Sequence, residues 1–83
     1  MIKVLYFAGL REALGTGAEE LALPAPGLDV AGLRTHLAAR GGDWDKLLST
    51  RNLRFAVNQD MARLETPVRD GDEVAFFPPV TGG

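Results

Sequence analysis

The stretch DGDEVAFFPPVTGG (residues 70–83) is the part of the sequence that decides the fold. Its Asp-Gly pair is typical of a tight turn, in which Gly71 suits a positive φ angle. The apolar and aromatic run that follows predicts a strand over Glu73–Phe77. Pro78 and Pro79 cannot donate to a sheet ladder, so we expect the strand to end there and the remaining residues to leave the sheet.

Four further segments have the branched and aromatic residues of strands, namely residues 2–8, 19–23, 53–58 and 61–64. In the first segment, alternation predicts two faces, with Ile2, Val4 and Tyr6 on one and Lys3, Leu5 and Phe7 on the other. We expect the first and last strands to join at the centre of the sheet, which would place the carboxyl-terminal tail just beyond it.

One main helix is predicted between the second and third of these segments. Asp29 is a typical N-cap residue at its start. Val30, Leu33 and Leu37 then recur at the spacing of one helical stripe. We expect the pair Gly41-Gly42 to end this helix.

Two shorter helical segments are predicted, over residues 9–15 and over residues 43–48 with Asp43 as the cap. Early strands, a packing helix and later strands fit an α+β domain of two layers, with a mixed sheet of about five strands on one main helix. A chain of 83 residues is one domain, 1–83, whose last residues, 78–83, form an extended tail.

Composition and charge exclude several classes of function. The net charge of −2 lacks the basic surface of a nucleic-acid binder. The chain has no cysteine, and His36 is its one histidine, so disulfides, Cys-ligated metals and His-cluster metal sites are excluded. The apolar run near the amino terminus does not have the pattern of a signal peptide, and no stretch approaches membrane-spanning length. We therefore expect a cytoplasmic protein that binds no membrane.

The whole chain resembles the small subunit of molybdopterin synthase, a ubiquitin-like β-grasp sulfur carrier. The matching segments are IKVLYFA and LREALG near the start, AVNQD in the middle and DGDEVAFFPPVTGG at the end, of which the last is the specific part. Two positions depart from the pattern. Gly9 stands where many members have a polar or charged residue, and Thr81 stands where many have serine, although the hydroxyl is kept.

The resemblance implies a sulfur carrier that binds no cofactor and has no complete active site of its own. A ubiquitin-activating-like adenylyltransferase would use ATP to adenylate the Gly83 carboxylate, which would then be converted to a thiocarboxylate. The charged tail would enter the large subunit of molybdopterin synthase and donate sulfur to cyclic pyranopterin monophosphate. The implied complex is a heterotetramer of two small and two large subunits.

The composition of the tail suits this chemistry. A terminal carboxylate is anionic at neutral pH and a poor electrophile, so it needs the leaving group that adenylation supplies. Six extended residues reach about 20 Å, enough to enter a channel in another protein. The residues expected in that channel are Pro78, Pro79, Val80, Thr81 and Gly82. The alternative interpretation is a frayed terminus, in which glycine is common.

Three apolar residues are candidates for a partner interface: Phe7, Met61 and Phe77. Phe76 and Phe77 have opposite parity on a strand, so one is expected in the core and the other outside. An outward Phe77 beside Phe7 and Met61 would form an apolar docking patch. The alternative is that all of these side chains serve one core.

Other conspicuous side chains are given structural positions. We expect His36 to be exposed on the main helix and Trp44 to cap the core, while Asp70, Asp72 and Glu73 form a solvated acidic turn. The competing functions are a sulfur carrier of the thiamin pathway, a ubiquitin-like protein modifier, and an interaction module with an inert tail.

Overall fold

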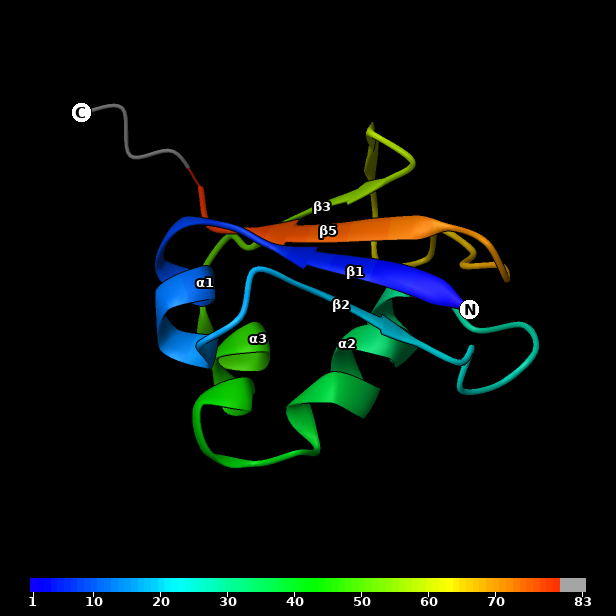
Figure 1. Ribbon diagram of the computed structural model, residues 1–83. Coiled ribbons are helices and arrows are strands. Elements are labelled where there is room, and N and C mark those ends of the chain that lie inside the picture. The colour runs from blue at the N-terminus through cyan, green and yellow to red at the C-terminus, as the bar shows by residue number, and fades with distance from the viewer. Residues whose placement is uncertain (80–83) are drawn as a thin grey trace.

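A five-stranded mixed sheet organises the chain, with the strand order β2-β1-β5-β3-β4 (Figure 1). The computed structural model describes residues 1–79. Its strands are β1 (Ile2–Tyr6), β2 (Ala18–Leu21), β3 (Arg54–Val57), β4 (Asp60–Ala62) and β5 (Glu73–Phe77). β1 and β5 are parallel, and every other neighbouring pair is antiparallel. The α+β class predicted from the sequence is confirmed.

The first and last strands meet as predicted. β5 is the middle strand, and in its register with β1 Val4 lies opposite Val74 and Tyr6 lies opposite Phe76. The tight turn before β5 contains Gly71 with a φ of 90°, which is the conformation that favours glycine. The bounds predicted for β5 are those observed.

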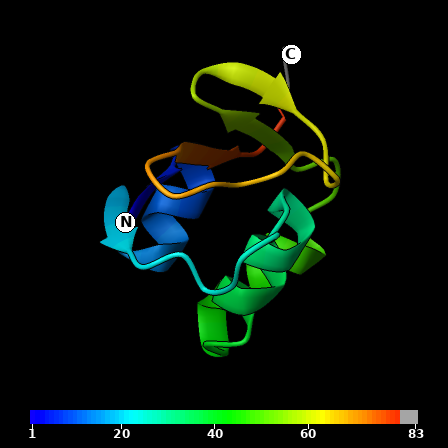
Figure 2. The same cartoon turned by 90° about the vertical axis from the view of Figure 1, so that its right-hand side faces the viewer.

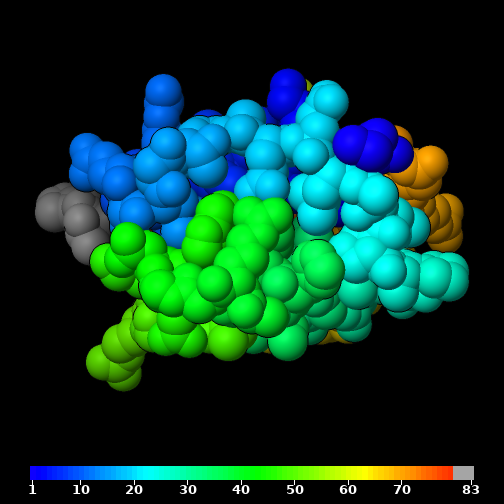
Figure 3. All heavy atoms as spheres, turned by 60° about the horizontal axis from the view of Figure 1, so that its bottom comes forward, coloured from blue at the N-terminus to red at the C-terminus, as the bar shows by residue number. Residues whose placement is uncertain are grey.

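The helical segments all lie on one side of the sheet (Figures 1 and 2). They are α1 (Ala8–Leu14), α2 (Val30–Ala38), the 3₁₀ helix η1 (Gly42–Asp45) and α3 (Lys46–Ser49). Figure 3 shows the surface on this side, where residues of α2 to α3 (green) lie beside those of α1 and the β2 region (blue to cyan). Within residues 1–79, no helix covers the opposite face of the sheet.

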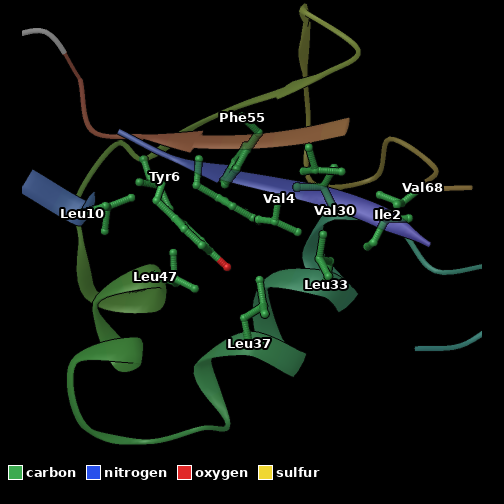
Figure 4. Packing of buried hydrophobic residues seen from close by; sticks show 13 residues of the cluster. Ile2, Val4, Tyr6, Leu10, Val30, Leu33, Leu37, Leu47, Phe55 and Val68 are labelled. Carbon is green, nitrogen blue, oxygen red and sulfur yellow. The ribbon is translucent and has the colours of Figure 1, made fainter. Parts of the chain in front are cut away.

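The core lies between the sheet and these helices (Figure 4). The predicted stripe of Val30, Leu33 and Leu37 is fully buried against it. Tyr6 and Phe76 stack with their ring centroids 6.2 Å apart, and Phe55 meets Phe76 edge-on at 5.8 Å. Most residues of the buried cluster therefore belong to the central strands and α2.

The start of α2 follows the predicted capping arrangement. The backbone N–H of Gly32 donates to the Asp29 side chain over 2.7 Å. Gly32 costs helix propensity but has a packing reason, because a Cβ at this position would come within 2.6 Å of the Leu28 side chain. The helix ends at Ala38, before the Gly41-Gly42 pair that was predicted to end it.

The predicted cap of the segment 43–48 is wrong. η1 begins one residue earlier, at Gly42, and Gly41 occupies the N-cap position without a side-chain hydrogen bond. Asp43 therefore lies inside the first turn, where its carboxylate pairs with the Lys46 ammonium over 3.4 Å.

Several strands are shorter than predicted. In the first two cases below, a strand ends where the neighbouring strand no longer offers a residue that can pair with it. β2 stops at Leu21, which lies opposite Ile2, so residues beyond it have nothing on β1 to pair with. β3 begins at Arg54, which lies opposite Phe77, and the next position on that side would face Pro78, which has no N–H. The first strand ends at residue 6 because α1 begins at residue 8, and β4 covers residues 60–62 rather than 61–64.

The turn between β3 and β4 leads to a stability prediction. Its two residues, Asn58 and Gln59, have φ angles of 51° and 72°, as in the tight hairpin turns that favour Asn-Gly. Glutamine is strained there, so Gln59→Gly should raise the free energy of unfolding by about 1 kcal/mol in urea denaturation. Gln59→Ala is the matched control and should bring no such gain. Equal stability of the two variants would contradict the prediction.

Candidate functional site

Enclosed sites are absent from the part of the chain that the structure describes. Residues 1–79 form no pocket, and they contain no group of three or more His, Asp or Glu side chains that could hold a metal ion. In the same residues, no helix combines the length and the apolar character needed to cross a membrane. The candidate site is an open surface, made by the uncovered face of the sheet and the end at which β5 leads into Pro78.

A row of apolar side chains crosses the middle of the uncovered face. Leu5 of β1 lies opposite Ala75 of β5, which lies opposite Ala56 of β3, and Ala56 lies opposite Met61 of β4. The two alanines are buried, whereas Met61 is 64% exposed. Small residues in the centre and larger ones at the sides give a shallow apolar strip that another protein can contact closely.

A second row lies at the end of the sheet where the tail leaves. Phe76 is fully buried, and Phe77 takes the opposite parity, as predicted. Phe7 follows β1 with 46% of its side chain exposed, and its ring meets that of Phe77 edge-on with centroids 6.5 Å apart. The two phenylalanines are therefore neighbours on the surface, next to the exit of the chain.

The predicted docking residues lie on one face. Phe7 and Phe77 are in contact. Met61 lies on β4, two strands away from Phe77, and belongs to the apolar strip that runs next to the two phenylalanines. Sequence reasoning missed Ala56 and Ala75 as members of this surface. The signal available in the sequence was that each alanine alternates along its strand with residues of the core. Every second residue of a strand shares a face, so the alanines belong to the opposite face.

The tail residues are only partly described. Pro78 and Pro79 are half-buried directly after β5 and belong to no strand, as expected from their lack of an N–H. The predictions made for Val80, Thr81, Gly82 and Gly83 lie outside the described residues.

On the opposite, helical side of the sheet, a cluster of charged and polar side chains connects a strand to the end of α2. Tyr6 donates from its hydroxyl to Glu19 over 2.8 Å, and Arg40 donates two hydrogen bonds of 2.8 Å to the same carboxylate. The hydrogen bonds from Arg40 lower the pKa of Glu19, whereas burial and the bond to Glu19 raise the pKa of Tyr6. Arg40 also lies over the Trp44 ring at 4.4 Å. The cluster thus ties the C-terminal end of α2 to β1 and β2.

Trp44 and His36 occupy the positions predicted for them. Trp44 is half-buried against the core and meets Tyr6 edge-on at 5.4 Å, and His36 is exposed on α2. Neither residue takes part in the uncovered face of the sheet.

The acidic turn before β5 is held by hydrogen bonds and an ion pair of its own carboxylates. The amino group of Met1 pairs with Asp70 and lowers the pKa of that carboxyl group. Asp72 accepts hydrogen bonds from the Asn58 side chain over 2.9 Å and from the Arg69 N–H over 2.8 Å. Asp70 is exposed, as predicted for a solvated turn, whereas Asp72 and Glu73 are half-buried.

A family model described as the ThiS family matches residues 4–83. The chain belongs to the ThiS family. A relative from Escherichia coli (strain K12), named molybdopterin synthase sulfur carrier subunit, is 52% identical and aligns over 100% of both chains. The predicted resemblance of this ThiS-family chain to that class of protein is confirmed.

Solved structures agree with the fold of the ThiS-family chain. A putative molybdopterin converting factor subunit 1 from Pyrococcus furiosus is 31% identical, has a TM-score of 0.79 and aligns over 95% of this chain and 97% of its own. A complex of subunits 1 and 2 of molybdopterin-converting factor from Helicobacter pylori contains a chain with a TM-score of 0.67 and 24% identity, with coverage of 99% and 97%. The ubiquitin-like β-grasp fold predicted for the chain is confirmed.

Proposed function

We propose that this ThiS-family chain is the sulfur-carrier small subunit of a molybdopterin synthase. The observation that carries the proposal is its 52% identity, over the full length of both chains, with a protein of that name. The fold supports it, because the central strand β5 leads directly into the tail at Pro78. The chain acts as a carrier, and catalysis belongs to the complex in which it works.

The proposed chemistry takes place at the Gly83 carboxylate. A carboxylate oxygen attacks the α-phosphorus of ATP on an activating adenylyltransferase, which forms an acyl-adenylate and releases pyrophosphate. Sulfide, or its equivalent at the same oxidation level, then attacks the acyl carbon, so that AMP leaves and a thiocarboxylate remains. This group donates its sulfur to cyclic pyranopterin monophosphate, and water restores the carboxylate. No cysteine of the chain is needed, and the chain has none.

The proposed partner is the large subunit of molybdopterin synthase, in a heterotetramer of two small and two large subunits in the cytoplasm. The apolar strip and the contacting pair of Phe7 and Phe77 supply the docking face, with Met61 at its edge. The Helicobacter pylori structure, named as a complex of subunits 1 and 2, supports such a pairing. Docking by this face leaves Pro78 and the residues after it free to enter the partner.

Mass spectrometry tests the proposal. Incubation with the adenylyltransferase, ATP and a sulfur source should replace one oxygen of the terminal peptide by sulfur. Oxidation of Met1 or Met61 adds a similar mass, so the change must be assigned to Gly83 by fragmentation. Omission of ATP is the control. An unmodified terminus, under conditions that charge a known carrier, would refute the proposal, and co-purification with a thiazole synthase instead would favour the thiamin pathway.

A further inference from the structure

Two arginines lie beside the aromatic pair on the uncovered face. Arg54 is directly opposite Phe77 in the pairing of β3 with β5. The ladder of β3 and β4 ends at the pair of Phe55 with Ala62, so Arg54 and Arg63 are the next residues at the same end of these two strands. Arg63 is exposed, whereas its neighbours Ala62 and Leu64 both pack against the core. The row at the tail exit therefore reads Phe7, Phe77, Arg54 and Arg63.

This pair of like charges is poorly compensated within the chain. Arg54 makes no ion pair within residues 1–79. Arg63 has only a 4.0 Å contact with Glu65, between side chains that are 85% and 73% exposed, and such pairs contribute little. The cations at the tail exit are thus available to another molecule.

The far end of the same face has the opposite charge. There Lys3 lies between Glu20 of β2 and Glu73 of β5, so the row has two carboxylates and one ammonium. Cations lie at the tail exit, apolar residues lie in the middle, and net negative charge lies at the other end. A surface with this polarity fits a partner of matching polarity in one direction only.

We propose that the large subunit has carboxylates at the mouth of the site that receives the tail, and that these contact Arg54 and Arg63. This inference rests on the proposed function. The contacts orient the small subunit, because reversing the face would set Glu20 and Glu73 against those carboxylates. They also increase the rate at which the tail finds its channel, since charges at the rim of an interface act mainly on association.

Association kinetics with the purified large subunit test the inference. Arg54→Glu and Arg63→Glu should each lower the association rate constant about tenfold at low salt, and the difference should shrink as salt rises. Lys46→Glu makes the same charge change on the helical side and should remain within about twofold of the wild type. Replacing the partner's carboxylates at the channel mouth by lysine should restore binding of the Arg54→Glu variant.

Each alternative result is informative. If both arginine variants associate like the wild type, while wild-type Gly83 still accepts sulfur and transfers it, the inference is wrong and the proposed function stands. A wild type that neither binds the large subunit nor accepts sulfur would overturn both. Sedimentation that shows a dimer of the isolated chain, lost in Arg54→Glu, would assign this face to a second copy and so overturn the inference.

Discussion

Deletion of Gly83 is expected to abolish sulfur transfer and to leave the domain folded. The deletion moves the terminal carboxylate back by one residue, which is about 3.3 Å of extended chain, and misplacement of a reacting group by about 1 Å can already cost 100-fold in rate. The buried core of the described chain ends at Phe76, so thermal unfolding should not change. Turnover with preformed thiocarboxylate and a thermal melt measure the two effects.

Thr81→Ser is the matched control for this deletion. It changes the tail but keeps its length and the hydroxyl, so transfer should remain near the wild-type rate. Retention of transfer by the shortened chain would show that the terminal position is not the working group. A fall of several degrees in the melting temperature of the shortened chain would show that the tail contributes to the fold.

Substitution of the two adjacent phenylalanines should separate stability from docking. Phe76 is fully buried and packs against Tyr6 and Phe55, so Phe76→Ala should lower the free energy of unfolding by about 3–5 kcal/mol. That is a large part of the 5–15 kcal/mol typical of a small domain. Within residues 1–79, the half-buried ring of Phe77 meets one other aromatic ring, that of Phe7, so Phe77→Ala should cost only about 1 kcal/mol.

The docking measurement should give the opposite order. Phe77→Ala should weaken binding to the large subunit about tenfold or more, because a few large anchor side chains carry most of the binding energy of an interface. Urea denaturation and titration calorimetry on the same preparations provide both numbers. Binding by Phe77→Ala that equals the wild type would remove this residue from the interface, and a stability loss as large as that of Phe76→Ala would place it in the core.

The sequence predicted well those features that depend on local chemistry. Asp29 caps α2 because its carboxylate, just before the first turn, accepts a hydrogen bond from a backbone N–H that has no partner within the helix. Gly71 allows the turn, and the two prolines end β5 where they remove donors. The terminal motif also identified the family, since its residues are specific in kind and order. Each of these inferences needed only a short segment of chain.

Features that depend on distant partners could not be predicted in this way. The end of β2 is set by the end of β1, and the reason for Gly32 is the close approach of Leu28. The placement of Arg54 and Arg63 at the same end of β3 and β4 follows from the register of that hairpin. These facts depend on which segments become neighbours, and no single segment contains that information.

The position of β5 in the sequence also determines when, during synthesis, the sheet can be completed. The middle strand of the sheet is the last to be synthesised, and it must pair with β1, the first. Contacts between such distant parts of a chain form slowly and late. An incomplete nascent chain lacks the strand that joins the two halves of the sheet, and so cannot present a docking face. Completion of β5 and acquisition of the native fold are therefore coupled events in the life of each molecule.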